Sequence, residues 1–310
     1  MIHKNMLETI GNSPVIELER VVKKHNIKGE IYAKIEFFCP GLSKKDRIAK
    51  HMILQAEKDG SLKPGQTVIE QTSGNTGIGL AAVCAVKGYP FIAVMSEGNS
   101  FERIVMIKQF GGKVHLVKQH PDSEKGKVSS ADMELVEKEF NRLSEEIKAY
   151  KVGQFYNVEN AMAHYHTTSK EIIKDLPNID AFCDYVGTGG SFEGIAKGLK
   201  EYKKSIQCFQ VEPAHAKHII QGGGYFKTPP FADSKNCDGK IVISDKEALY
   251  WAKELSEVEA IAGGISSGAN LAAAISYLKK NPGKSIVFLV NDPMLKYMSA
   301  PDIQNWDSIK

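Results

Sequence analysis

The sequence predicts an α/β protein with parallel-type sheets, and three observations lead to this prediction. Six short apolar runs recur along the chain and are rich in β-branched residues, as is typical of strands that are buried on both faces. Ala-rich or amphipathic stretches of helical character separate these runs, and such an alternation favours a parallel sheet. The length of 310 residues favours two domains, at roughly 100–200 residues per domain.

Strands and helices are expected in alternation along the chain. The expected strands are TVIEQ (67–71), FIAVMS (91–96), KVHLVK (113–118), AFCDYVG (181–187), QCFQVEP (207–213) and SIVFLVN (285–291). The clearest expected helices are GIGLAAVCAVKG (77–88) and SGANLAAAISYLKKN (267–281). Residues 121–151 differ, because they are heavily charged, with Glu and Lys at helical spacing. We expect a solvated helix there, near a domain boundary.

Composition argues against several classes of protein. Forty Lys and Arg residues against 37 Asp and Glu residues give a formal charge of +3. This excess is too small for binding to a phosphate backbone, so we expect no nucleic-acid partner. The N-terminus lacks the apolar segment of a secretion signal, and no apolar run approaches the roughly 18–20 residues that cross a bilayer. We therefore expect a cytoplasmic protein without a membrane partner.

Cysteines and histidines do not form a metal-binding pattern. The five cysteines are widely spaced, without a CxxC pair, which argues against a disulfide framework and a zinc ribbon. His164 and His166 flank one tyrosine, and His215 and His218 lie three residues apart. No matching set of Cys or carboxylate residues accompanies them. Because zinc needs three or four convergent ligands, we expect no metal site.

Small polar residues follow the expected strand 67–71. In EQTSGNTG (70–77), hydroxyl groups, an amide and free backbone N–H groups meet at the start of a helix. Such a turn can bind an anion, because the N–H groups converge and the helix dipole is positive there. A plain helix cap is the alternative interpretation, since Ser, Thr and Asn are favoured caps.

A second turn, DYVGTGGSFEG (184–194), also opens a helix. Its glycines allow the backbone to close around a phosphate, and two hydroxyl groups accompany them. A dinucleotide-binding G-x-G-x-x-G turn is the rival, but Phe192 occupies its sixth position. Pyrophosphate needs close packing there, so a single phosphate fits better. No Walker-type segment and no G-x-S-x-G turn occur, which leaves Walker-type nucleotide binding and the hydrolase triad unsupported.

The stretch FFCPGLSKKDRIAK (37–50) would by itself indicate only solvated charge. Together with the two turns, however, it resembles the fold-type II enzymes of pyridoxal 5′-phosphate (PLP), specifically the cysteine synthase (O-acetylserine sulfhydrylase) and cystathionine β-synthase family. That family carries four motifs in order, and all four occur here over nearly the whole chain. They are PGLSKKDR (40–47), TSGNTG (72–77), GTGG (187–190) and GISSGA (264–269).

The resemblance implies two three-layer α/β domains of the tryptophan synthase β type, with PLP in the cleft between them. The smaller domain is expected at 41–151, and the larger domain at 1–40 plus 152–310. Family members are usually homodimers, so we expect a homodimer. From the length of 310 residues, we expect no haem-binding or regulatory extension of the kind found in cystathionine β-synthase.

The resemblance also implies roles for individual residues. The lysine that binds PLP covalently is the one directly before Asp-Arg, which is Lys45 and not Lys44. Asn75 would hydrogen-bond the ring hydroxyl of PLP, and Ser266 would face its pyridine nitrogen. The phosphate would be held by Gly187, Thr188, Gly189, Gly190 and Ser191. The carboxylate of an amino-acid substrate would be held by Thr72, Ser73, Thr76 and Gln154, the last from the family-like segment Q-F-x-N (154–157).

These residues indicate replacement or elimination at Cβ of a 3-substituted L-alanine, either O-acetylserine or cysteine. A carboxylate in place of Ser266 would keep the pyridine nitrogen protonated, whereas a hydroxyl need not. The cofactor is then a weaker electron sink, which disfavours transamination. Lys45 would remove the α-proton, the β-substituent would leave and a nucleophile would add. With sulfide as nucleophile the product is cysteine.

Three alternatives stay open. The first is a cysteine-consuming enzyme that releases hydrogen sulfide and adds water, giving serine, or a thiol. The second is a serine/threonine dehydratase-like lyase, which the KDR and ISSG contexts fit less well. The third is an inactive binding protein, since fold does not fix function. An intact Lys45 and both turns argue against the third.

The chain departs from the family pattern at four places. Cys39 stands where Asn is usual, and Lys44 stands where an apolar residue is usual. The segment NDPMLKYMS (291–299) replaces P-x-x-G-x-R-Y-L-S, and the loop 221–239 differs from the common synthase loop. That loop contains Asp233. Because water needs a base to attack Cβ, Asp233 is a candidate catalytic residue that would activate water, with a surface turn acid as the alternative.

Overall fold

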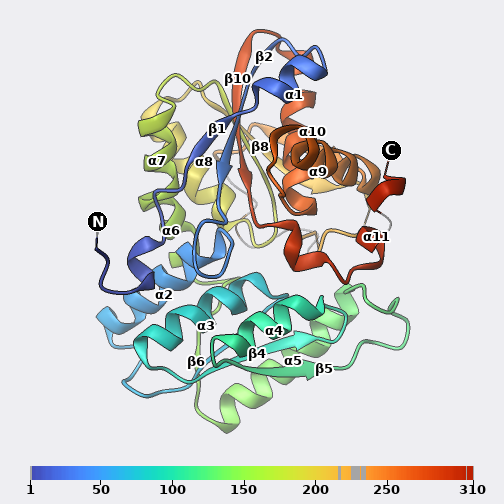
Figure 1. The fold of residues 1–310 in the computed structure, drawn as a ribbon. Helices are drawn as coiled ribbons and strands as arrows, with labels where there is room; N and C mark the ends of the chain where they lie inside the picture. Colours follow the sequence, from blue (N-terminus) through green and yellow to red (C-terminus); the bar gives the residue numbers. More distant parts are fainter. Residues whose placement is uncertain (1, 216–217, 225–230, 232–234, 305, 310) are drawn as a thin grey trace.

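Two separate β-sheets organise the chain in the computed structural model (Figure 1). The structure describes residues 2–215, 218–224, 231, 235–304 and 306–309. The larger sheet has six strands in the order β1-β2-β10-β7-β8-β9. All neighbouring strands in it are parallel apart from the edge pair β1–β2, which is antiparallel. Its strands are β1 (Val15–Glu17), β2 (Gly29–Ile35), β7 (Ala181–Tyr185), β8 (Gln207–Pro213), β9 (Gly239–Ile243) and β10 (Lys284–Val290).

The smaller sheet has four strands in the order β5-β4-β3-β6, and all its neighbours are parallel. Its strands are β3 (Val68–Gln71), β4 (Phe91–Ser96), β5 (Lys113–Val117) and β6 (Tyr150–Lys151). All six apolar runs of the sequence are strands within two residues of the expected bounds. The strands β1, β2, β6 and β9 were not predicted from the sequence, and most of them are short or lie at a sheet edge.

Helices connect the strands. The α-helices are α1 (Glu19–Lys24), α2 (Lys45–Asp59), α3 (Asn75–Lys87), α4 (Phe101–Gln109), α5 (Ser130–Glu146), α6 (Glu159–His166), α7 (Thr168–Asp175), α8 (Gly190–Tyr202), α9 (Asp245–Glu259), α10 (Ile265–Lys280) and α11 (Pro301–Gln304). The short 3-10 turns are η1 (Met6–Thr9), η2 (Met294–Tyr297) and η3 (Trp306–Ser308).

Apolar packing makes each sheet the middle of three layers. One face of the larger sheet packs against α9 and α10, and Phe288 belongs to that cluster. The opposite face packs against α7 and α8, where Phe182 stacks on Phe192. The smaller sheet packs against α2, α3 and α4 on one face and against α5 on the other, through Val136 and Phe140. The predicted fold class is therefore confirmed.

The charged stretch 121–151 is only partly helical. A capping box fixes the start of α5, since the Ser129 side chain accepts from the Asp132 backbone and Asp132 accepts in return. The residues before Ser129 form turns instead, with Gly126 at a φ of +82°. The expected helix over the whole stretch was therefore too long, because charge spacing does not reveal a cap.

The strands of the smaller sheet all lie between residues 68 and 151, and those of the larger sheet come from residues 15–35 and 181–290. The exact domain boundaries stay a prediction. None of the helices in the described ranges is long and apolar enough to cross a membrane.

Candidate active site

Both polar turns of the sequence lie at the carboxyl ends of parallel strands, where α/β proteins commonly bind ligands. The turn after β3 opens α3, and the turn after β7 opens α8. One pocket is lined by both turns together with the start of α2 and of α10. The predicted residues that line it are Lys45, Thr72, Ser73, Asn75, Thr76, Gln154, Gly187, Thr188, Ser191 and Ser266. Gly189 and Gly190 are the N-cap and first residue of α8, and Asp233 lies outside the described residues.

Lys45 is the first residue of α2 and lines the pocket. Burial and the positive charge of Lys44 lower the pKa of Lys45 to about 7, although the carboxylate of Asp184 opposes the shift. A large share of this amine is therefore neutral near neutral pH. Only the neutral form can act as a nucleophile or a base.

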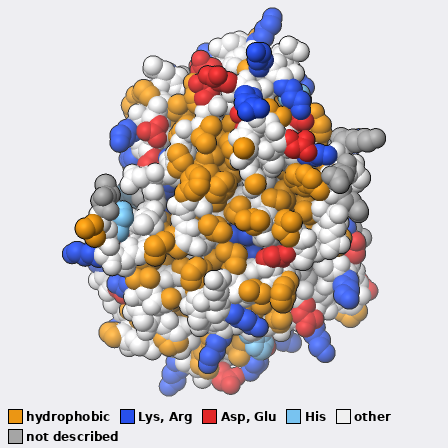
Figure 2. Space-filling view, viewed as in Figure 1, with side chains coloured by type: hydrophobic (Ala, Val, Ile, Leu, Met, Phe, Trp, Pro, Cys, Tyr) orange, Lys and Arg blue, Asp and Glu red, His pale blue; other side chains and the backbone are white. Residues whose placement is uncertain are grey.

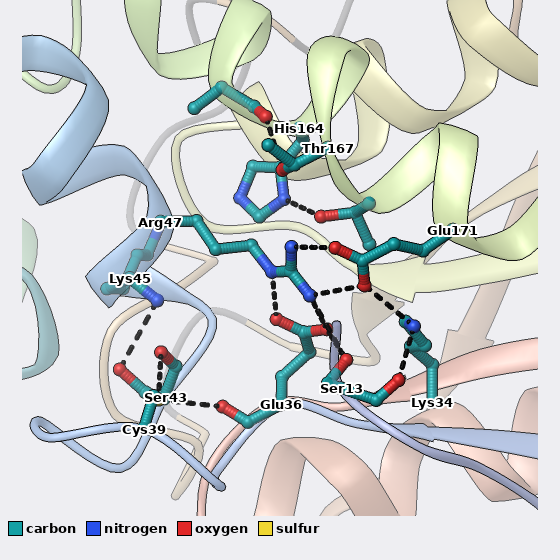
Figure 3. Close-up of polar contacts among 12 residues, drawn as sticks. Ser13, Lys34, Glu36, Cys39, Ser43, Lys45, Arg47, His164, Thr167 and Glu171 are labelled. Atoms are coloured by element: carbon teal, nitrogen blue, oxygen red, sulfur yellow. Dashed lines mark hydrogen bonds and ion pairs between the residues drawn. The ribbon is translucent and has the colours of Figure 1, made fainter. Parts of the chain in front are cut away.

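Ion pairs anchor the helix that carries Lys45 (Figure 3). Arg47 donates to both oxygens of Glu36 at 2.6 and 2.8 Å, and to both oxygens of Glu171 at 2.6 and 2.8 Å. Lys34 of β2 reaches Glu171 at 2.8 Å. Burial raises the pKa of Glu171, but the hydrogen bonds and charges of Arg47 and Lys34 outweigh this effect and lower it to about 2. The cluster ties α2 to the larger sheet and to α7, so it fixes the position of Lys45.

Asn75 begins α3 with both ends of its amide engaged. Its Oδ1 accepts from Lys296 Nζ at 2.8 Å, and its Nδ2 donates to Asp292 Oδ2 at 2.7 Å. Lys296 also donates to the carbonyl of Gly41 at 2.6 Å. The Asn75 side chain also forms a hydrogen bond with Tyr297, so its neighbours hold the amide in one orientation at the edge of the pocket. Burial lowers the pKa of Lys296 to about 8, although Asp292 and Asp46 oppose the shift.

The turn after β7 forms a cradle of backbone. Gly189 has a φ of +89° and caps α8, a conformation that favours glycine. A Cβ on Gly187 would lie 2.6 Å from the carbonyl oxygen of Gly222, so glycine is required there as well. The first N–H groups of a helix have no partner within the helix, and the dipole is positive. The cradle therefore suits an anion.

Hydroxyl and amide groups line the same pocket as the cradle. Thr76 Oγ1 donates to Gln154 Oε1 at 2.6 Å, so these two residues are in direct contact. Thr72 Oγ1 accepts from the backbone N–H of Gly74 and Gly77 at 3.0 and 3.2 Å. Thr72 thus shapes its own turn.

At the far side of the pocket, Ser266 lies in the first turn of α10. Asn291 Nδ2 donates to Ser266 Oγ at 3.0 Å. Because this hydroxyl already accepts a hydrogen bond, its own hydrogen is free to donate. An unprotonated ring nitrogen is the acceptor that suits such a donor.

The profile of the family described as "Pyridoxal-phosphate dependent enzyme" matches residues 6–292. The chain belongs to this family of PLP-dependent enzymes. The cysteine synthase B of Campylobacter jejuni is 37% identical over 309 residues, which cover 96% of this chain and 98% of the relative. A cysteine synthase of Staphylococcus aureus (strain N315) is 36% identical over 311 residues, covering 96% of each chain. The crystal structure of a hydrogen sulfide-producing enzyme from Fusobacterium nucleatum is 40% identical, with a TM-score of 0.87, and covers 96% of this chain and 100% of that one.

The residues of the pocket fit the cofactor of the PLP-dependent enzymes. The Lys45 amine has the lowered pKa that covalent attachment to an aldehyde requires. The glycine cradle at 187–190 has no room for a Cβ at Gly187 and suits a phosphate. Ser266 keeps a donor for the ring, and Asn75 lines the same pocket. The enzyme therefore uses PLP, as the resemblance predicted.

Several residues that support this pocket were not found from the sequence. Asn160 of α6 donates to the Gln154 carbonyl at 2.6 Å and to Thr188 Oγ1 at 3.1 Å, and so connects Gln154 to the cradle. Lys296, Asp292 and Asn291 lie in the segment 291–299, whose departure from the family pattern was the available signal. No sequence motif marked Asn160, because a single Asn within a helix does not by itself indicate a functional role.

Glu70 gives a testable pH dependence of stability. Its buried carboxyl accepts from the backbone of Gly153 at 2.7 Å. Burial raises the pKa of Glu70 to about 8, although hydrogen bonds from Gly153 and Gln154 oppose the shift. Between pH 4.5 and about 8, the folded state holds a proton on Glu70 that the unfolded chain has lost. The contribution of Glu70 to the free energy of unfolding is therefore full below pH 4.5 and is lost as the pH rises to about 8.

We expect Glu70→Gln to gain stability relative to the parent as the pH rises. The amide can accept the same backbone bond and does not ionise. Urea unfolding should show the free-energy difference between the two proteins moving by at least ~1 kcal/mol in favour of the variant between pH 5 and pH 8. A difference that stays constant over this range would contradict the buried, protonated carboxyl.

Proposed function

We propose that this enzyme exchanges the β-substituent of O-acetylserine for sulfide and so makes cysteine. One observation carries the proposal: the Lys45 amine, with its pKa lowered to about 7, shares a pocket with the hydroxyl-rich turn 72–76 and the glycine cradle. The cysteine synthase relatives support the same activity. When bound, PLP stabilises negative charge at Cα of the amino acid.

Each group in the pocket then has a role. Lys45 takes the α-proton of the substrate and returns it to the product, which its lowered pKa allows near neutral pH. Ser73, Thr76 and Gln154 hold the α-carboxylate, and this orients the Cα–H bond toward Lys45. Ser266 donates to the ring nitrogen without ionising, which favours loss of a β-leaving group over transamination.

The test is product identification by mass spectrometry. We expect cysteine from O-acetylserine plus sulfide, and little turnover of serine. Turnover of serine to a keto acid would favour a dehydratase instead. A protein that turns over none of O-acetylserine, cysteine and serine would contradict the proposal and favour a binding protein.

A second candidate is the conversion of cysteine and water to serine and hydrogen sulfide. The hydrogen sulfide-producing enzyme of Fusobacterium nucleatum, 40% identical, and the unusual loop 221–239 favour it. In this reaction the Cβ–S bond breaks, a Cβ–O bond forms and a base takes a proton from water. We propose Asp233 as that base.

Asp233→Asn tests this second function. If Asp233 activates water, we expect the variant to lose at least ~100-fold in serine formation, while one equivalent of sulfide per active site still leaves in the first turnover. Asp238→Asn in the same loop is the matched control and should form serine at the parental rate. Undiminished serine formation in the Asp233 variant, or none from the parent, would contradict the role.

We also propose a homodimer that works in the cytoplasm. Figure 2 shows hydrophobic side chains gathered over the middle of one face, with charged side chains mostly around its rim. Phe101 and Val105 of α4 expose 67% and 43% of their surface, and Leu295 and Met298 beside η2 expose 64% and 54%. Such exposed apolar groups are typical of protein interfaces. Sedimentation velocity should give a mass of two chains.

A further inference from the structure

Lys44 and Asp184 form a buried ion pair beside the glycine cradle. Lys44 Nζ lies 2.9 Å from Oδ1 and 2.7 Å from Oδ2 of Asp184. The two side chains expose 8% and 0% of their surface. Lys44 directly precedes Lys45, and Asp184 is the second-last residue of β7. The pair therefore joins the entry to α2 with the strand that leads into the cradle.

Asp184 also holds a hydroxyl of the cradle. Ser191 Oγ donates to Asp184 Oδ2 at 2.6 Å, and Asn270 Nδ2 lies 3.3 Å from Asp184 Oδ1. Lys44, Thr188 and Ser191 line the same pocket. One carboxylate thus orients both a cation and a hydroxyl at this end of the pocket.

Stability alone does not account for this pair. Both ions lose hydration on burial, and replacing a buried ion pair by apolar groups is often neutral or stabilising. The family motif itself usually has an apolar residue at the position of Lys44. A phosphate ester, by contrast, carries a charge of about −1.5 to −2 at neutral pH. A cation at the cradle would meet that charge.

We propose that Lys44 is a cationic ligand of the PLP phosphate and that Asp184 is the positioning residue that holds its ammonium group at the cradle. An ammonium group has three N–H donors, and the two oxygens of Asp184 engage two of them. The third is available to the phosphate. Hydrogen bonds from a charged donor are roughly twice as strong as neutral ones. This inference rests on the proposed placement of the phosphate at residues 187–191.

The experiment compares PLP with pyridoxal, which lacks the phosphate. Apoenzyme is prepared from the holoenzyme, and dissociation constants are measured by equilibrium dialysis. In the double variant Lys44→Met with Asp184→Asn, both charges are gone and the amide can still accept from Ser191. We expect the Kd of PLP to rise at least ~10-fold and the Kd of pyridoxal to change less than ~2-fold, because only PLP carries the charge-assisted bond.

The single variant Lys44→Met tests the charge of Asp184 separately. It leaves the Asp184 carboxylate unpaired beside the phosphate, so we expect it to bind PLP more weakly than the double variant does. The ion pair Lys200–Asp238 contacts the same helix α8 through Lys200. The variant Lys200→Met with Asp238→Asn is the matched control, and it should bind both compounds like the parent.

Two results would overturn the inference: equal weakening of PLP and pyridoxal, which indicates a structural role, or unchanged affinity for both. Circular dichroism confirms that each variant is folded. Gly189→Asp separates this inference from the placement of the phosphate. If Gly189→Asp weakens PLP binding and the double variant does not, only the role of Lys44 fails. If neither variant weakens PLP binding, both the placement of the phosphate at residues 187–191 and the role of Lys44 are wrong.

Discussion

Replacing Lys45 with alanine is expected to lower the rate of cysteine formation by at least ~10³-fold, since one residue supplies both the covalent attachment and the base. The structure favours this because Lys45 lines the pocket and has a pKa lowered to about 7. The neighbouring Lys44 cannot replace it, because its ammonium group is held by Asp184. Stopped-flow and steady-state assays with O-acetylserine and sulfide measure the loss.

Borohydride reduction and peptide mapping give the control for this variant. The purified parent protein should be yellow, and reduction should leave the pyridoxyl group on Lys45. The Lys45→Ala protein should bind PLP without becoming labelled. A pyridoxyl group found on Lys44 would show that the motif had been registered one residue too late.

The lowered pKa of Lys45 adds a pH dependence with a defined sign. Covalent attachment needs the neutral amine, so the rate at which PLP attaches to apoenzyme should rise with pH and level off above about 7. An ordinary lysine would show a rise that continues toward pH 10. Absorbance after rapid mixing at fixed PLP concentration distinguishes the two profiles.

Individual strands show which parts of the fold can be predicted from the sequence. Strands buried on both faces, such as β4 and β10, can be predicted from the sequence because their apolar runs are nearly continuous. The edge strand β1 has only three residues with a partly exposed pattern, so no periodicity marks it. Its existence depends on β2, which pairs with it.

The site shows the same contrast. Turns such as 72–77 are contiguous, so their chemistry is visible in one stretch of sequence. The Lys44–Asp184 pair joins residues 140 positions apart, and Asn75 meets Lys296 across 221 positions. Pairs of this kind exist only once two sheets have been packed together. The sequence marked Lys44 as a departure from the family pattern, but it did not indicate Asp184 as its partner.

Gly189→Asp is expected to weaken PLP binding by at least ~100-fold, because it places a carboxylate at the positive end of α8 where the phosphate is proposed to lie. Gly189 has a φ of +89°, which Asp and Asn tolerate better than most residues. Gly189→Asn is therefore the matched control for size and backbone strain, and the excess loss in the Asp variant measures the charge.

Three further comparisons make this prediction specific to the phosphate. The Asp variant should lose less affinity for pyridoxal than for PLP, because pyridoxal carries no anion to be repelled.

Gly283 also has a positive φ, of +81°, with open space around it, so Gly283→Asp tests strain alone and should leave PLP affinity unchanged. High salt should reduce the difference in PLP affinity between Gly189→Asn and Gly189→Asp, because salt screens the repulsion between the new carboxylate and the phosphate. If Gly189→Asp and Gly189→Asn bind PLP equally, no phosphate charge lies at this turn, and residues 187–191 must be removed from the cofactor site.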